Sequence, residues 1–168
     1  KDASAPGAKA LAAEQHAWLQ GELRAARSPA ENAKHIVVFG HIPPFIDSPD
    51  EPAGYFNWDL ATRQAVLSEL KAAKVAAFFC GHFHQNAGGF DEGLEVVVTS
   101  AVGVSLQSKT SDRLNLPVAL RSPPIGPDVS GLRVVDVTEK GVTHQWYTLN
   151  SLPVLSENSS HCIALRPC

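Results

Sequence analysis

The feature that most constrains this fold is an alternation of helical and extended apolar patterns along the first half of the chain. Apolar residues recur at helical spacing over Ala10–Arg27 and again over Asp59–Lys74. Each of these segments is followed by a short run rich in β-branched or aromatic residues. The two runs, His35–Phe39 and Val75–Cys80, both stop at a glycine, which is typical of buried strands. The order helix, strand, helix, strand predicts an α/β fold with central buried strands.

The second half of the chain is expected to be mainly extended. Leu94–Ser100, Leu132–Thr138 and Val142–Leu149 are rich in β-branched or aromatic residues, and each predicts a strand. Glu139–Gly141 separates the last two and predicts a hairpin turn. Residues 86–89, with the sequence Asn-Ala-Gly-Gly, predict a tight turn rather than a strand.

The length of 168 residues predicts one folded domain, because domains usually hold about 100–200 residues. We expect this domain over residues 8–150 and a polar tail over residues 151–168. Residues 104–130 contain four prolines and are too long for an ordinary connection, so this stretch predicts a surface insertion or a lid.

Charge and hydropathy exclude two classes of protein. The chain has 17 acidic residues against 14 lysines and arginines, a net charge of −3. Nucleic-acid binders and polybasic membrane modules need clustered positive charge instead. The apolar runs are also far shorter than the about 20 residues that span a bilayer. We therefore expect neither a nucleic acid nor a membrane as a partner.

The three cysteines, Cys80, Cys162 and Cys168, bear on the cellular compartment. An odd number leaves at least one thiol unpaired within the chain, which favours a reducing, cytoplasmic location. A secreted protein stays open as the alternative. In that case Cys162 and Cys168 could form a disulfide, and Asn158 lies in an N-glycosylation pattern.

Histidines at the predicted strand ends are the residues most suited to chemistry. His41 follows Gly40 after the first strand, and His82 and His84 follow Gly81 after the second. Ligands collect at the carboxyl ends of strands in α/β sheets, and glycine lets the chain turn close to a bound ion. In extended backbone both imidazoles of the His-x-His pair would point the same way, which suits zinc, iron or manganese. Such a pair is also often incidental, so a structural role stays open.

Carboxylates usually complete a site of this kind, and here they are hard to name. Asp47, Asp50 and Glu51 lie in the loop after the first strand, where a solvated acidic loop would explain them equally well. The predicted turn at residues 86–89 would leave Asn86 free to face whatever the histidine pair binds.

Two motifs resemble the last two metal-binding motifs of calcineurin-like metallophosphoesterases: Phe39–Pro43 (Phe-Gly-His-Ile-Pro) and Gly81–His84 (Gly-His-Phe-His). The similarity covers residues 14–149 and is greatest to the subgroup named serine/threonine phosphatase with a calcineurin-like phosphoesterase domain. The segments that carry this closer resemblance are Glu14–Leu19, Tyr55–Asn57, Gly81–Gly89 and Gly131–Val135. The resemblance implies that residues 8–150 form the C-terminal half of a four-layer α/β/β/α metallophosphoesterase sandwich.

The resemblance also implies an activity. A metal-bound hydroxide would attack the phosphorus of a phosphomonoester in line, at two divalent ions of manganese, iron or zinc. The substrate would be a phosphoprotein, with phosphoserine or phosphothreonine, or a small phosphoester. His41 and His82 would bind one ion and His84 the other, while Asn86 and Tyr55 would lie beside the ligands or the substrate.

The sequence departs from the family in one respect. The family's earlier motifs are Asp-x-His, Gly-Asp-x-x-Asp and Gly-Asn-His-Glu. None of the 12 glycines here precedes Asp or Asn, and Asp-x-His does not occur. Three imidazoles without the bridging carboxylate should not hold two ions, so we expect this chain alone to be inert.

Two functions therefore stay open for the complete protein. One is a metal-dependent phosphoesterase, and the other is a non-catalytic structural or interaction protein on the same scaffold. Either would need the missing N-terminal half, or a partner chain, to cover the exposed sheet edges.

Overall fold

The computed structural model describes residues 7–103, 105 and 130–152. Its longer helices are α1 (Ala8–Ala26) and α2 (Leu60–Ala72), and η2 (Leu149–Ser151) is a short 3-10 helix. Its strands are β1 (Val37–Phe39), β2 (Ala77–Cys80), β3 (Ala87–Asp91), β4 (Leu94–Val98), β5 (Gly131–Thr138) and β6 (Gly141–Thr148). Nearly all of the predicted insertion and tail, including Asn158, Cys162 and Cys168, lies outside the described residues.

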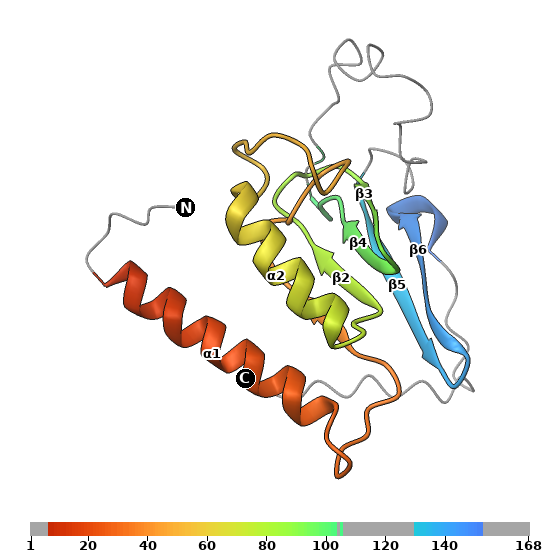
Figure 1. The fold of residues 1–168 in the computed structure, drawn as a ribbon. Coiled ribbons are helices and arrows are strands. Elements are labelled where there is room, and N and C mark those ends of the chain that lie inside the picture. The colour runs from red at the N-terminus through yellow and green to blue at the C-terminus, as the bar shows by residue number, and fades with distance from the viewer. Residues whose placement is uncertain (1–6, 104, 106–129, 153–168) are drawn as a thin grey trace.

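The strands form one mixed sheet and one separate hairpin (Figure 1). The sheet has the order β1-β2-β4-β3, in which β1, β2 and β4 are parallel and β3 runs antiparallel to β4. Strands β5 and β6 form the predicted antiparallel hairpin. The predicted α/β class is confirmed, and so are the helices and strands expected from apolar patterns, within one or two residues at most ends.

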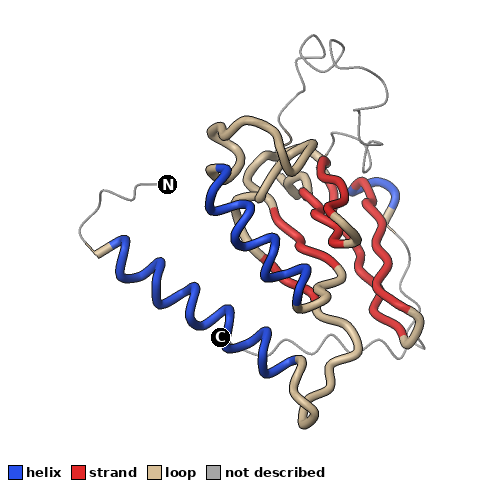
Figure 2. Tube along the Cα trace, viewed as in Figure 1, coloured by secondary structure: helices blue, strands red, loops and turns tan. Residues whose placement is uncertain are grey.

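The molecule has three layers, because α2 covers one face of the sheet and the β5–β6 hairpin covers the other (Figures 1 and 2). The alternation of side chains along β4 shows how the two faces differ. Leu94, Val96 and Val98 belong to the larger apolar core on the helix face. Val97 belongs to a smaller cluster on the hairpin face, where Val135 packs against it.

Helix α2 begins where the sequence predicted. Asp59 is its N-cap, and the carboxylate accepts a hydrogen bond from the Thr62 N–H at 3.0 Å. Hydrogen bonding from that N–H lowers the pKa of Asp59. Helix α1 lies beside α2, to which His16 is linked through a 2.8 Å contact with Glu69. Within the described parts of the chain, no helix is both long and apolar enough to cross a bilayer.

The predicted tight turn at residues 86–89 is wrong, because this segment opens strand β3. Its glycines suggested a turn, but Gly88 instead allows close approach between two strands. Gly88 has φ +121°, and a Cβ there would collide with the Val96 carbonyl oxygen of β4.

Candidate metal centre

The parallel pairing of β1 and β2 brings the two Gly-His segments together. Phe39 is in register with Phe79, so both strands end at the same edge of the sheet. The Gly81 N–H donates to the His41 carbonyl at 3.0 Å and ties one loop to the other. The imidazole rings of His41 and His82 are 5.1 Å apart between centroids. Two histidines separated by 41 positions in sequence thus become neighbours.

The histidine loop, defined here as residues 81–86 between β2 and β3, is not extended. His82 has φ +64° and His84 has φ +57°, so both lie in the left-handed region. The premise that extended backbone aligns their imidazoles is therefore wrong. Non-glycine residues adopt this region at a cost of about 1–3 kcal/mol each, and such strain concentrates at functional sites.

Aromatic residues surround His82. Its Nε2 lies 3.4 Å from the Tyr55 carbonyl oxygen, and its ring centroid is 5.2 Å from that of Tyr55 and 5.5 Å from that of Phe56. Because the carbonyl only accepts, Nε2–H donates and Nδ1 is left for another ligand. Metal-binding histidines commonly donate their second N–H in this way. Tyr55 remains 71% exposed beside the histidine pair.

Glu51, in the acidic loop after β1, holds that loop in shape. Its carboxylate accepts from the backbone N–H groups of Ile46 at 2.7 Å, Asp47 at 2.8 Å and Ser48 at 3.1 Å. It also accepts from the Asn57 side chain. The sequence alone did not show this structural role for Glu51.

Arg63 of α2 also holds the acidic loop after β1 in place. Its fully buried guanidinium donates to the carbonyls of Pro49, Glu51 and Trp58 at 2.9, 2.6 and 2.8 Å. Arginine suits this task because its planar group carries five donors in a fixed arrangement. The segment that carries Tyr55 is thus fastened to the helix layer.

Asn86 lies at the other end of the histidine loop and is only 2% exposed. Its Oδ1 accepts from the Ser100 N–H at 3.2 Å and from Arg133 Nη2 at 2.8 Å. The expectation that a turn leaves this side chain free is therefore wrong. The structure places Asn86 in a polar network between the sheet and the hairpin.

Sequence reasoning did not assign a role to Arg133, although it lay in a motif noted for resemblance. One signal was available, because Arg133 and Val135 are two residues apart on β5 and so share a face. Val135 points at the sheet, which puts a charge on an inward face. Burial lowers the pKa of Arg133 to about 10, against the opposing effect of Glu95. The guanidinium therefore stays charged at neutral pH.

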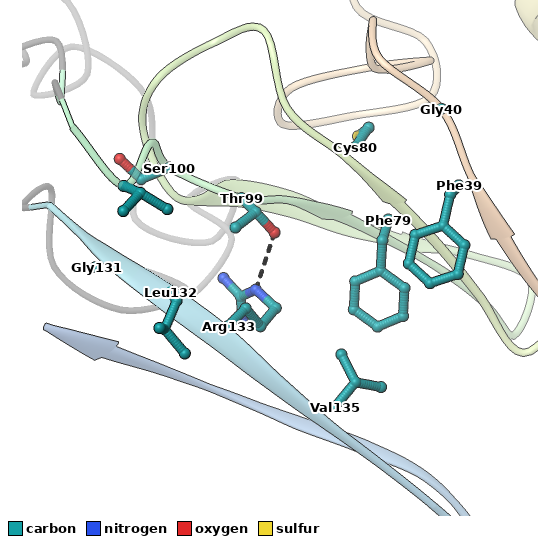
Figure 3. Close-up of a pocket in the computed structure, with 11 residues that line it drawn as sticks. Phe39, Gly40, Phe79, Cys80, Thr99, Ser100, Gly131, Leu132, Arg133 and Val135 are labelled. Atoms are coloured by element: carbon teal, nitrogen blue, oxygen red, sulfur yellow. Dashed lines mark hydrogen bonds between the residues drawn. The ribbon is translucent and has the colours of Figure 1, made fainter. Parts of the chain in front are cut away.

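A cavity of about 300 Å³ separates the ends of β1 and β2 from β5 (Figure 3). Phe39, Phe79 and Val135 give it mostly apolar walls, and Arg133 lies at one side. Cys80 also lines it, and burial raises the pKa of that thiol. The three candidate metal-binding histidines are not among the residues that line it.

The donor set does not form a complete metal site. Among residues 7–103, 105 and 130–152, no group of three or more His, Cys, Asp or Glu side chains could hold an ion. His41 and His82 supply two imidazoles at one point, and carboxylates usually complete sites that hold zinc, iron or manganese. Further ligands are needed before this pair could bind an ion firmly.

Comparison with known proteins supports the fold. No known family model matches the chain. Among solved structures, the chain is similar to "GAP50 the anchor in the inner membrane complex of Plasmodium". The TM-score is 0.55 at 16% identity, over 77% of this chain and 36% of that one. The α/β fold with its separate hairpin thus matches part of the fold of that protein.

Curated proteins give closer sequence matches. The chain is 38% identical to serine/threonine-protein phosphatase CPPED1 of Danio rerio over 136 residues, and 37% identical to that of Homo sapiens over 139. These alignments cover 80% and 82% of this chain but only 37% and 38% of the relatives. The chain is homologous to the CPPED1 serine/threonine-protein phosphatases, which confirms the predicted kinship.

Proposed function

We propose that this chain forms the C-terminal part of a metal-dependent phosphomonoesterase, one that acts on phosphoserine or phosphothreonine in proteins. The observation that carries the proposal is the His41–His82 pair, brought together at the ends of two parallel strands. Homology to the CPPED1 phosphatases supports the substrate class. Divalent ions, when bound, would supply charge stabilisation on the attacking and leaving oxygens.

The chain's own residues have defined parts in this proposal. His41 and His82 would bind one ion and His84 the other. The Tyr55 carbonyl would hold the His82 ring in place through Nε2–H, while its exposed side chain would face the substrate. Carboxylates from outside this sequence, in a longer chain or a partner, would complete the site. Asn86 would position its loop rather than contact the substrate.

The test is hydrolysis of an aryl phosphate with added Mn²⁺, on the protein as its gene encodes it. We expect His82→Ala to abolish turnover, because the variant loses one imidazole of the pair. His16→Ala is the matched control, since His16 contacts Glu69 on the distant helix layer and should leave turnover unchanged. Full activity of His82→Ala would contradict the proposed metal-dependent phosphoesterase function.

A non-catalytic anchor or interaction protein is the second candidate. Two observations favour it: the incomplete donor set among the described residues, and the similarity to a solved protein described as an anchor. This candidate predicts stoichiometric association with a larger assembly and no retained metal. About two ions per chain after dialysis, the number typical of two-metal phosphatase sites, would contradict it. A cytoplasmic location stays a prediction for both candidates.

A further inference from the structure

We infer that Arg133 is a positioning residue for the histidine loop and that it acts through Asn86 and Ser100. The inference rests on the proposed metal-binding role of the loop's histidines. Arg133 lies on β5 in the hairpin layer, 47 positions from Asn86 along the chain. The hairpin would thus act as a clamp that fixes where the proposed ligands stand.

The contacts run continuously from the hairpin to the loop. Arg133 Nη2 donates to Asn86 Oδ1 at 2.8 Å, and the same oxygen accepts from the Ser100 N–H at 3.2 Å. Ser100 Oγ then donates to the His84 carbonyl at 3.0 Å. The loop is therefore held both through a side chain at its end and through the backbone of a proposed ligand.

The guanidinium is itself fixed by its other contacts. Nε donates to Thr99 Oγ1 at 3.1 Å (Figure 3), and Nη1 donates to His144 Nδ1 at 2.9 Å. His144 Nε2 lies 3.1 Å from the Glu95 carboxylate. Because arginine only donates and a carboxylate only accepts, these contacts select the His144 tautomer with its proton on Nε2. A network in which each member has a partner orients the guanidinium towards the loop.

Backbone strain explains why the loop needs such a clamp. His82 and His84 have left-handed φ values, and such a strained backbone persists only where surrounding contacts hold it in place. Of the side chains on the hairpin, Arg133 reaches three different segments at once: Thr99 after β4, His144 on β6 and Asn86 in the loop. Lysine could not replace it, because an ammonium is a point charge without the planar set of donors.

The experiment compares Arg133→Met with Arg27→Met in the protein as its gene encodes it. Arg27 is likewise a hydrogen-bond donor, but to the backbone carbonyls of Ala73 and Lys74 on the helix layer rather than to side chains around the histidine loop. Two readouts are needed: Mn²⁺ affinity by calorimetric titration, and amide hydrogen exchange of the histidine loop by mass spectrometry. We expect Arg133→Met to weaken Mn²⁺ binding about 10-fold, the low end of the 10–100-fold effect of losing a direct partner of a metal ligand, because Arg133 acts through Asn86 and Ser100.

Loop exchange should rise in Arg133→Met while exchange in α2 stays as in the wild type. Arg133→Lys should not restore either value. Ser100→Ala, a milder change that keeps the arginine, should move both readouts in the same direction and covers the case in which Arg133→Met does not fold. The inference would be overturned if Arg133→Met kept the Mn²⁺ affinity and the loop exchange of the wild type. It would also be overturned if hydrogen exchange in Arg133→Met rose by the same factor throughout the molecule.

The two proposals can fail separately. If the wild-type protein binds no Mn²⁺ but Arg133→Met still loosens the histidine loop selectively, the proposed function is wrong and the positioning role stands. If the wild type binds Mn²⁺ and Arg133→Met equals it in both Mn²⁺ affinity and loop exchange, the positioning role is wrong and the proposed function stands.

Discussion

The two faces of the central sheet are built on different principles. The helix face buries a large apolar core that includes Leu67, Leu70, Val96 and Val98. The hairpin face buries only Ala77, Phe79 and Val97, with a few partly buried residues against them. Around that small cluster the hairpin face is held by polar contacts, in which Glu95 and Thr99 of the sheet side meet His144 and Arg133.

The two faces therefore have different roles: the helix face mainly stabilises the fold, and the hairpin face mainly positions the histidine loop. Apolar burial is non-directional and grows with the area removed from water, so it suits the helix face as the main source of stability. Hydrogen bonds are directional and depend on distance, so the hairpin face is suited to fixing the orientation of one loop. The comparison predicts that substitutions on the helix face lower global stability, and that those on the hairpin face act locally.

Leu70→Ala should give the largest loss of stability. Leu70 lies on α2 and is fully buried in the large core, and removal of such a side chain costs about 2–5 kcal/mol of unfolding free energy. Chemical denaturation followed by circular dichroism measures the effect. A loss below that of an ordinary surface substitution would mean that the helix face is not the main source of stability.

Val96→Ala and Val97→Ala form a matched pair. The two valines are neighbours on β4, both are fully buried, and they point to opposite faces. Each change removes two methyl groups and should cost about 1.5 kcal/mol or more. We expect Val96→Ala to raise hydrogen exchange across α2 and the sheet, and Val97→Ala to raise it mainly in the β5–β6 hairpin. The same exchange pattern in both variants would contradict the proposed difference between the two faces of the sheet.

Asp59→Asn should give the smallest effect and one that depends on pH. The carboxylate has a lowered pKa in the folded state, so its charge contributes stability above the unfolded value of 3.8. That contribution is lost as pH falls through the lower folded pKa. Asparagine caps helices about as well as aspartate, so the variant should be slightly less stable at pH 7 and equal to the wild type near pH 2.

Thermal unfolding at both pH values measures this difference. Asp50→Asn, a similar change at an exposed loop position, is the matched control. Asp59→Ala should cost about 1 kcal/mol at neutral pH, because it removes the cap itself. A pH-independent difference between the wild type and Asp59→Asn would show that the charge on this residue contributes no stability.

Most of the fold follows from periodic apolar patterns in the sequence. The helix at Asp59 and the strands before Gly40 and Gly81 were predicted because one face of each had to be buried. Strand β3 was missed because its two adjacent glycines give no apolar alternation. The need for Gly88 arises from a neighbouring carbonyl in β4, which no local pattern reveals.

The candidate site was predictable only in part. Gly-His motifs after two buried strands indicated His41 and His82, and parallel pairing then made them neighbours. The left-handed backbone of the histidine loop was not predictable, because it depends on contacts made after folding. The role of Glu51 also depends on geometry, since its carboxylate binds amides of its own loop. Arg133 contacts Thr99 and Asn86, which lie 34 and 47 positions away in the sequence, and patterns within a short window cannot predict contacts over such separations.

We propose that the strand-end histidines bind metal as part of a phosphoesterase homologous to the CPPED1 phosphatases. The most direct measurement is the metal content of the dialysed protein, as its gene encodes it, by inductively coupled plasma mass spectrometry. We predict about two ions of manganese, iron or zinc per chain in the wild type, with a clear loss in His82→Ala and none in His16→Ala. Metal-free wild-type protein, or an unchanged metal content in His82→Ala, would contradict the claim.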